Sequence, residues 1–265
     1  MKFRDLIEAS HLQHRPLVVP EEWSQGRTVF GGLVVALANE AMLGYVAHGR
    51  VLRSLAVAFV APVSTDQPLF FEAEVLREGS AVTHLHCRVI QREETVTSIH
   101  ACYGAQRQSA LLLPGQAQFE LPTLEGCTQL PFLPGVTPRY LQHFDVRWGL
   151  GEMPFTGGAS TTTGGWIRFK DESGEASLSE SHLLTMLDAW PPSVLSLCKG
   201  AVPGCSLTWS IELVQPLAPQ PANAWCAMAL TTEYALHGYS ACSAALRSAD
   251  GQLLALGRQT VAVFG

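Results

Sequence analysis

The sequence predicts an α+β protein built from two tandem copies of one unit, a long apolar helix covered by a curved antiparallel β-sheet. Three observations carry this prediction: a helix that has no polar face, strand-like segments that follow it, and the return of the same order of segments in the second half of the chain. A helix without a polar face is stable in water only where other elements cover every side of it. The alternative is an ordinary two-layer α+β protein in which the repeat is a coincidence.

The first helix is predicted within VFGGLVVALANEAMLGYVAHG, residues Val29–Gly49. From Leu33 to Ala47 this segment is almost entirely Leu, Val, Ala and Met, and Asn39 and Glu40 are its only strongly polar residues. Burying a polar side chain costs free energy unless the side chain is hydrogen-bonded. The polar pair therefore requires buried partners or a function.

Strand-like segments follow this helix and return later in the chain. The first series is LRSLAVAFVAPV (Leu52–Val63), LFFEAEVLREGS, VTHLHCRVIQ and TVTSIHACYGAQ, and the second is CSLTWSIELVQPL (Cys205–Leu217), AWCAMALTTE, YSACSAALRS and QLLALGRQTVAVF. Several of them alternate apolar and polar residues, which is the period of a strand with one buried face. The turn SADG carries an Asp-Gly pair, which is typical of a β-hairpin.

The two series match in order and spacing. Pro62 and Pro216 end equivalent strands, and the last strands align with Cys102 opposite Gln259. The repeat requires a second helix before the second series, and ESHLLTMLDAWPPSVLSL (Glu180–Leu197) occupies that place. Tandem duplication of one helix-and-sheet unit therefore explains most of the chain.

The domain boundaries follow from the segment between the copies. We expect an N-terminal unit at residues 1–106, a connector at 107–138 and a C-terminal unit at 139–265. The connector holds five prolines and no sustained period, and it is long for a loop inside one domain. The segments YLQHFDVRW and TTTGGWIRFKD are predicted as further strands that open the second unit.

Composition narrows the class of partner. The chain is 47% hydrophobic and 15% charged, against roughly 25% charged residues in an average soluble domain, so self-association as a homo-oligomer is expected. Its net charge of −6 and the lack of a basic cluster argue against nucleic acid as a partner.

The cysteines indicate the compartment. Seven cysteines without a C-x-x-C pair favour a reducing compartment. With no secretory signal and no membrane-spanning run, we expect a cytoplasmic protein that binds no membrane.

Four motifs together resemble one family. They are GRTVFGGLVVAL (Gly26–Leu37), FVAPV with EAEVLREGS (within Phe59–Ser80), HLLTMLDAW (His182–Trp190) and GRQTVAVF (Gly257–Phe264). Each motif alone is weak, but their order, spacing and duplication resemble the double-hotdog acyl-CoA thioesterases, the type II (TesB-like) enzymes. The likeness covers nearly the whole chain apart from the connector.

The resemblance implies a fold and a reaction. The fold is a double hotdog, and the reaction is hydrolysis of an acyl-CoA thioester to free acid and CoA by a positioned water. No metal and no organic cofactor is implied, since CoA is part of the substrate. The low charged fraction favours a homo-oligomer such as a dimer of double hotdogs, and larger assemblies stay open.

The resemblance also places the residues that position the water. It puts the carboxylate on Asp188, the amide on Gln259 and the hydroxyl on Ser206. Because Thr208 and Ser210 share a strand face with Ser206 by alternation, the hydroxyl stays open among these three residues. We expect Asp188, Gln259, Ser206 and Thr208 to be the candidate catalytic residues.

The sequence around Asp188 also indicates a role for this residue independently of the family resemblance. It is the only acid between Glu180 and Glu212, and it lies in an apolar helix that Pro191 and Pro192 must stop or kink. A carboxylate in a dry cleft has a raised pKa and can act as a general base on water. The alternative is that Asp188 caps a helical segment that begins near Pro191.

The candidate substrate-binding residues are Gly31, Gly32, Asn39 and Trp190. The two glycines free backbone N–H groups at a helix N-terminus, which suits an oxyanion, although a tight turn would need them equally. When the two helices are aligned, Asn39 falls opposite Asp188, and the two glycines fall opposite Glu180 and Ser181. This pattern predicts one working site per chain, made from the glycines and Asp188, with Asn39 in a remnant site. The neighbouring carboxylate of Glu40 leaves open a second site in the first copy.

Two other functions remain open from the sequence. An enoyl-CoA hydratase would use His182 with Asp188, but their spacing is not the usual arrangement. A non-catalytic acyl-CoA- or lipid-binding protein is the second alternative. Because the chain lacks a G-x-S-x-G elbow, an α/β-hydrolase thioesterase is disfavoured.

Overall fold

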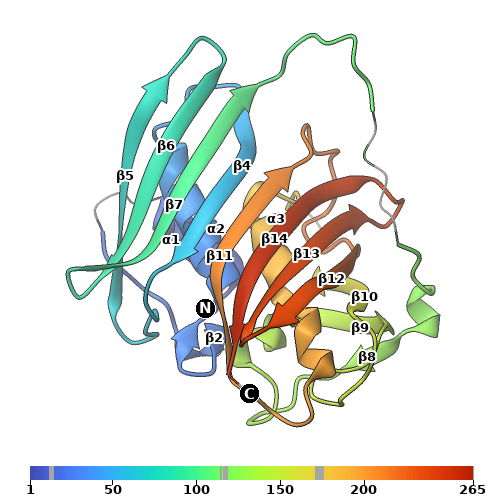
Figure 1. The fold of residues 1–265 in the computed structure, drawn as a ribbon. Coiled ribbons are helices and arrows are strands. Elements are labelled where there is room, and N and C mark those ends of the chain that lie inside the picture. Colours follow the sequence, from blue (N-terminus) through green and yellow to red (C-terminus); the bar gives the residue numbers. More distant parts are fainter. Residues whose placement is uncertain (12–14, 114, 116–118, 171–175, 265) are drawn as a thin grey trace.

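The computed structural model describes residues 1–11, 15–113, 115, 119–170 and 176–264, and it contains two central helices covered by one long curved sheet (Figure 1). The helices are α1 (Phe3–Ser10), α2 (Gly31–Leu43) and α3 (Glu180–Ala189), with 3-10 turns at Glu21–Trp23, Leu124–Gly126, Arg139–His143 and Ser193–Leu197.

The strands fall into two series, as the repeat predicts. The first half holds β1 (Leu17–Val18), β2 (Ser24–Gln25), β3 (Thr28–Val29), β4 (Arg50–Phe59), β5 (Pro68–Glu78), β6 (Val82–Gln91) and β7 (Glu94–Ala105). The second half holds β8 (Thr128–Leu130), β9 (Phe144–Leu150), β10 (Thr162–Phe169), β11 (Gly204–Leu213), β12 (Cys226–Leu236), β13 (Tyr239–Ser248) and β14 (Leu253–Val263).

One twelve-stranded antiparallel sheet joins the two halves, in the order β1-β5-β6-β7-β4-β11-β14-β13-β12-β10-β9-β8. The halves meet where β4 pairs with β11, and Ala56 there faces Ser210, its equivalent in the repeat. The inner order β5-β6-β7-β4 is mirrored by β12-β13-β14-β11, so a local two-fold axis passes through the central pair. This arrangement confirms the predicted α+β double hotdog.

The helix α2 is covered on every side, as its composition requires. Every residue from Gly32 to Met42 is buried, including Asn39 and Glu40. The concave face of the first half covers one side, and α3 and α1 pack on the others (Figure 1). α2 is shorter than the segment predicted from the sequence, because regular helix ends at Leu43 before Gly44.

The second helix ends where its prolines predict. α3 stops at Ala189, and Pro191 and Pro192 separate it from the 3-10 turn Ser193–Leu197. Proline lacks the backbone N–H that the helix would need to continue. Pro191 and Pro192 therefore offer no N–H donor to the last carbonyl groups of α3.

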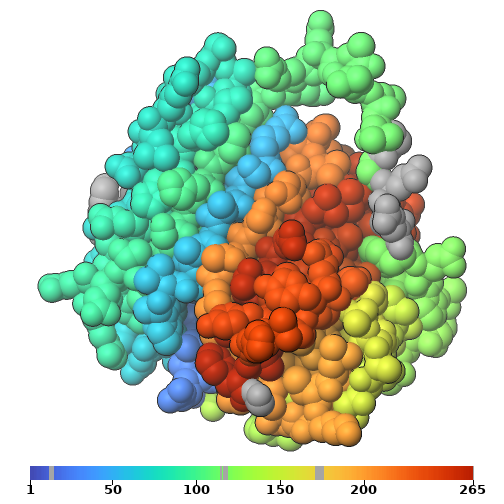
Figure 2. Space-filling view, in the orientation of Figure 1, coloured from blue at the N-terminus to red at the C-terminus, as the bar shows by residue number. Residues whose placement is uncertain are grey.

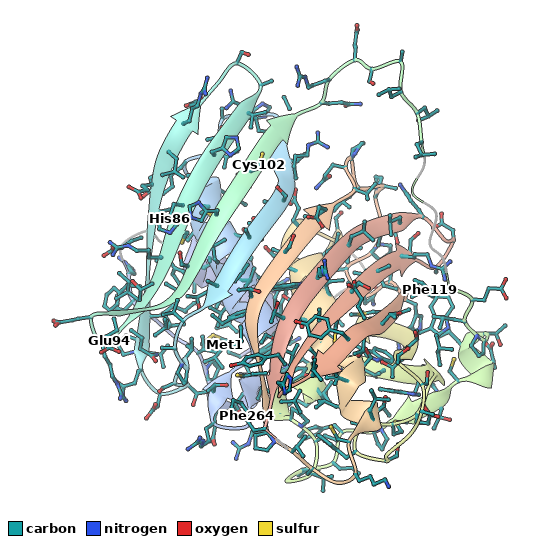
Figure 3. The ribbon with its side chains drawn as sticks, viewed as in Figure 1. Met1, His86, Glu94, Cys102, Phe119 and Phe264 are labelled. Carbon is teal, nitrogen blue, oxygen red and sulfur yellow. The ribbon has the colours of Figure 1, made fainter. Side chains whose placement is uncertain are left out.

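The alignment of the last strands was wrong by one residue. Ala56 pairs with His100 in β7, and its equivalent Ser210 pairs with Arg258 in β14. The pairing therefore equates Gln259 with Ala101 rather than with Cys102. A slip of one residue turns a strand's side chains to the opposite face. Cys102 accordingly lies half-exposed on the outer face of β7, where Figure 3 labels it.

The connector is not wholly without strand structure. Its residues Thr128–Leu130 form β8, which pairs with β9 at the edge of the sheet. Near Phe119, labelled in Figure 3, the guanidinium of Arg247 lies 3.9 Å from the ring centroid. Earlier in the connector, Leu111, Leu112 and Leu113 are about nine-tenths exposed, and Figure 2 shows this part standing away from the body. The domain boundaries themselves stay a prediction.

Two further expectations concern the whole chain. The seven cysteines are all free, in agreement with the absence of a disulfide framework. Among the described residues, no helix has the length and the apolar character needed to cross a bilayer.

Candidate active site

Asp188 is held by hydrogen bonds from both halves of the chain. The backbone N–H of Gly32 donates to its Oδ2 atom at 2.6 Å, and the Nε2 amide of Gln259 donates to its Oδ1 atom at 2.6 Å. Three residues that the sequence singled out therefore meet at one carboxylate. The carboxylate bonds to no residue of the turn after Pro191, so the alternative of a helix cap is wrong.

The packing of the two helices creates this meeting point. α2 and α3 run antiparallel, so the N-terminus of α2 lies beside the last turn of α3, where Asp188 stands. The first N–H groups of a helix have no partner within the helix and carry partial positive charge. The carboxylate satisfies one of these donors, and β14 supplies the second donor through Gln259.

Glycine is needed because the helices approach closely. A Cβ atom on Gly32 would lie 2.8 Å from Asp188 Cβ and 2.8 Å from Phe30 Cζ. A Cβ atom on Gly31 would lie 3.1 Å from Asp188 Oδ2 and 3.3 Å from the Phe59 ring. Both glycines therefore permit contact with the carboxylate. In this structure the Gly32 N–H orients the carboxylate, and the predicted oxyanion role of the glycine turn stays a prediction.

The surroundings raise the proton affinity of Asp188. Burial raises the pKa of its carboxyl group from 3.8 to about 6, while the hydrogen bonds from Gln259 and Gly32 act in the opposite direction. Burial disfavours the charged form because few dipoles replace the lost water. The carboxyl group is therefore ionised at neutral pH and still basic enough to accept a proton.

The hydroxyl group at the site belongs to Ser206. Its Oγ donates to Gln259 Oε1 at 3.4 Å, so Ser206, Gln259 and Asp188 form one chain of hydrogen bonds. The predicted alternative Thr208 is wrong, because the pairing of β11 with β14 shifts register between Ser206 and Thr208. An irregularity of this kind breaks alternation. Thr208 and Ser210 are consequently exposed on the outer face.

Trp190 lies in the core directly after α3. Its side chain is 2% exposed and stacks on Trp148 at a centroid distance of 4.8 Å. The two stacked rings lie at the C-terminal end of α3, the end that carries Asp188. A role for Trp190 in lining an acyl site stays a prediction.

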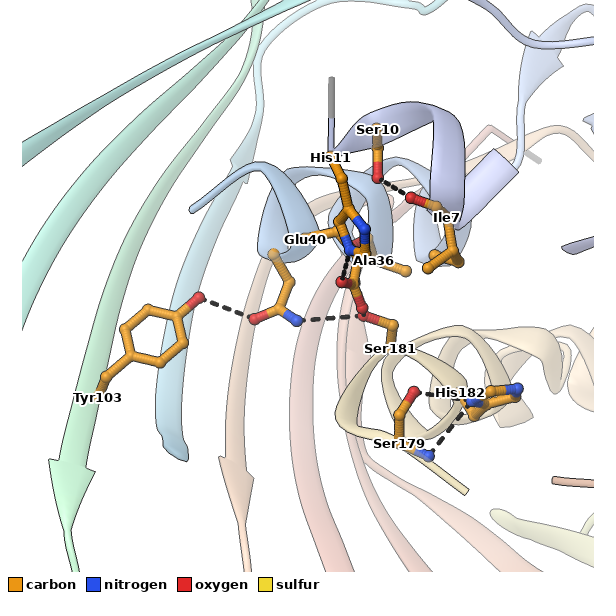
Figure 4. Close-up of polar contacts among 10 residues, drawn as sticks. Ile7, Ser10, His11, Ala36, Glu40, Tyr103, Ser179, Ser181 and His182 are labelled. Carbon is orange, nitrogen blue, oxygen red and sulfur yellow. Dashed lines mark hydrogen bonds and ion pairs between the residues drawn. The ribbon is translucent and has the colours of Figure 1, made fainter. Parts of the chain in front are cut away.

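The polar pair of α2 belongs to a second buried cluster, shown in Figure 4. Asn39 Nδ2 donates to Ser181 Oγ at 3.1 Å, and Tyr103 donates its hydroxyl to Asn39 Oδ1 at 2.8 Å. Ser181 in turn donates to Glu40 Oε1 at 2.6 Å, and His11 Nε2 lies 2.6 Å from Glu40 Oε2. We call these five residues the remnant cluster.

The remnant cluster is related to the Asp188 site by the local two-fold axis. Asn39 on α2 contacts Ser181 on α3, just as Asp188 on α3 contacts Gly32 on α2. Where one site has an acid against a glycine, the other has an amide against a serine. The sequence did not identify Ser181, Tyr103 or His11, because they come from α3, from β7 and from the end of α1, and only the folded chain brings them to Asn39 and Glu40.

Comparisons with known proteins agree with this architecture. The model of the acyl-CoA thioesterase N-terminal domain matches residues 19–104, and that of the acyl-CoA thioesterase C-terminal domain matches residues 124–263. The Acyl-CoA thioesterase 2 of Haemophilus influenzae is 35% identical over 77 residues. That match covers 29% of this chain and only 27% of the relative.

Solved structures with the same fold span nearly the whole chain. A hot dog fold protein of unknown function from Alicyclobacillus acidocaldarius has a TM-score of 0.81 at 22% identity, covering 93% of this chain and 91% of its own. The tesB protein of Mycobacterium avium subs paratuberculosis has a TM-score of 0.77 at 16% identity and covers 100% of both chains. Acyl-CoA thioesterase II TesB2 of Mycobacterium marinum has a TM-score of 0.74 at 18% identity, covering 98% of each chain.

At these identities the structural likeness shows the fold, and the family assignment depends on the two domain models. They match in chain order, one on each half of the duplicated sheet, and the C-terminal model alone spans more than half of the chain. The chain therefore belongs to the acyl-CoA thioesterase family.

Proposed function

We propose that the protein hydrolyses acyl-CoA thioesters to free acid and CoA, at one working site per chain centred on Asp188. The observation that carries the proposal is a carboxylate of raised pKa held between a helix N-terminus and a strand amide. Family membership supports the class of substrate. No cofactor is part of the proposal, because each step below uses water, substrate and the residues of this chain.

In the proposed reaction, Asp188 accepts a proton from water while the water oxygen bonds to the thioester carbonyl carbon. The resulting tetrahedral intermediate breaks its C–S bond, and the electron pair of that bond passes to sulfur. Asp188 then returns the proton to sulfur, which leaves as the CoA thiol. A base with a pKa of about 6 is suited to both transfers near neutral pH.

Gln259 and Ser206 orient the base and the water. The amide nitrogen of Gln259 is committed to Asp188, and its oxygen accepts the Ser206 hydroxyl, so the amide has a fixed orientation. We assign to Ser206 the contact with the attacking water, since a hydroxyl group can accept as well as donate a hydrogen bond. The positive end of the α2 dipole lies at the same carboxylate and would stabilise charge that develops there.

The direct test is thiol release from a panel of acyl-CoA esters of increasing chain length. We expect multiple turnovers on at least one member, with free acid and CoA in equal amounts. An inert protein on every chain length would overturn the proposal. Hydration of crotonyl-CoA without thiol release would favour the hydratase, and tight binding without turnover would favour the binding protein.

The pKa of Asp188 predicts the pH profile. Below about pH 6 the carboxyl group of the free enzyme is protonated and cannot accept a proton from water, so kcat/KM should fall about tenfold for each further pH unit. Above that pH the acid limb should level off. The measurement is kcat/KM against pH, which reports the free enzyme, and a flat profile down to pH 4 would exclude Asp188 as the base.

Replacing Asn39 tests whether the remnant cluster contributes to stability but not to catalysis. Asn39→Ala leaves the buried Tyr103 hydroxyl without its acceptor, whereas Ser181 keeps its hydrogen bond to Glu40, so we expect a loss of about 2 kcal/mol in the free energy of unfolding. Turnover per folded molecule should stay at the wild-type value. Urea unfolding and a thiol-release assay on the same preparation check both parts.

The proposal extends to location and assembly. A low charged fraction and seven free cysteines support a homo-oligomer, a dimer of double hotdogs, in the cytoplasm. The expected setting is fatty acid metabolism, because acyl-CoA thioesters are its activated intermediates.

A further inference from the structure

Tyr140 bridges the two helix ends that form the Asp188 site, although it is not part of the hydrogen-bond chain at the carboxylate. It lies in the 3-10 turn Arg139–His143, which precedes β9. Its hydroxyl donates to the backbone oxygen of Ala189 at 3.0 Å, and its side chain is 2% exposed. Ala189 is the residue after Asp188 and the last residue of α3.

The ring of Tyr140 reaches the other helix. It stacks on Phe30 with a centroid distance of 4.0 Å and an interplanar angle of 9°. Phe30 directly precedes α2, and its ring edge lies against Gly32, whose N–H holds Asp188. One side chain therefore contacts the C-terminal end of α3 through its hydroxyl and the N-terminal end of α2 through its ring.

The hydroxyl group of Tyr140 supplies a hydrogen-bond donor close to the end of α3, where the two prolines have none. The last carbonyls of a helix lack partners within the helix and carry partial negative charge. Pro191 and Pro192 follow and have no N–H to offer to them. By donating to Ala189, Tyr140 satisfies one of these carbonyls and offsets the negative potential beside the carboxylate. Burial and the charge of Asp188 raise the pKa of Tyr140, so its hydroxyl keeps its proton.

We infer that Tyr140 is a positioning residue, which holds the last turn of α3 and its Asp188 carboxylate against the N-terminus of α2. This inference rests on the proposed function of Asp188. Tyr140 does not touch the reacting atoms; it acts through the Ala189 carbonyl and through Phe30. Three groups from other elements then act on Asp188: the Gly32 N–H, the Gln259 amide and the Tyr140 hydroxyl.

The chain offers a matched control for this inference. Tyr103 is also fully buried, and it donates its hydroxyl to Asn39, the equivalent of Asp188 in the remnant cluster. Tyr103→Phe and Tyr140→Phe thus delete the same atom at two related places. A general loss of packing or folding would affect both variants, whereas only Tyr140→Phe should alter the reaction.

The experiment measures kcat, KM and the pH profile of kcat for the wild type, both variants and Tyr140→Leu. For Tyr140→Phe we expect kcat to fall about tenfold at unchanged KM, with the acid limb at higher pH because the unpaired carbonyl favours protonation of Asp188. Tyr140→Leu also loses the ring stack on Phe30, so its kcat should fall further than that of Tyr140→Phe. Tyr103→Phe should keep kcat and the acid limb while unfolding at lower urea concentration.

The outcomes separate this inference from the proposed function. If the wild type turns over, Asp188→Asn is inactive and Tyr140→Phe matches the wild type, the positioning role is wrong and the proposed function stands. Equal changes in kcat and acid limb for Tyr103→Phe and Tyr140→Phe would also overturn it. A wild type without turnover would overturn the proposed function and this inference with it.

Discussion

Asp188→Asn should abolish thioester hydrolysis in a protein that still folds. Asparagine has almost the same shape, and its amide oxygen can still accept the Gly32 N–H. It cannot accept a proton from water, however, and general-base catalysis contributes typically about 10²- to 10⁴-fold to a rate. We therefore expect kcat to fall by at least about 100-fold, with acyl-CoA binding retained. The measurement is thiol release together with a binding isotherm for the same acyl-CoA.

Glu40→Gln is the matched control for this variant. Glu40 is a buried carboxylate on the other helix of the pair, and it belongs to the remnant cluster. If the working site contains only Asp188, the glutamine variant retains wild-type kcat, because Glu40 takes no part in the reaction. A loss of turnover in Glu40→Gln with full activity in Asp188→Asn would assign catalysis to the first half instead.

The sequence predicted the fold because the fold depends on patterns that many residues share. The apolar run of α2 requires cover on all sides, and the alternating segments after it supply a curved sheet. The repeat then placed Asp188 against Gly32 through the equivalence of the two helices. Family matches on both halves agree with that duplication.

Details that depend on single residues were not predictable in the same way. The irregularity after Ser206 moves Thr208 to the outer face, and no sequence period records such a shift. A slip of one residue likewise set Cys102 opposite Gln259. Tyr140 and Ser181 were missed because each is one polar residue whose partner lies far away in the chain.

Gly32→Val is the second change with a large expected effect, because it adds atoms where the two helices touch. The first added atom would already lie 2.8 Å from Asp188 Cβ, which is closer than nonbonded carbon atoms approach. Asp188 Cβ is fixed to the backbone of α3, so relief requires a shift of the helix or of the carboxylate. A displacement of about 1 Å at a catalytic group can cost about 100-fold in rate. Overpacking of this kind also costs about 1–3 kcal/mol of stability.

We therefore expect Gly32→Val to lose turnover about 100-fold or more, and Gly32→Ala to lie between it and the wild type. Gly79→Val is the control, because a Cβ atom there would meet only the Val82 oxygen, at an ordinary 3.5 Å. A graded loss at residue 32 with no loss at residue 79 would show that the close approach of α2 and α3 sets the geometry of the base. Full activity in Gly32→Val would mean that the Gly32 N–H is not needed to hold Asp188. The site would then depend on Gln259 alone, and Gln259→Ala should show the larger loss.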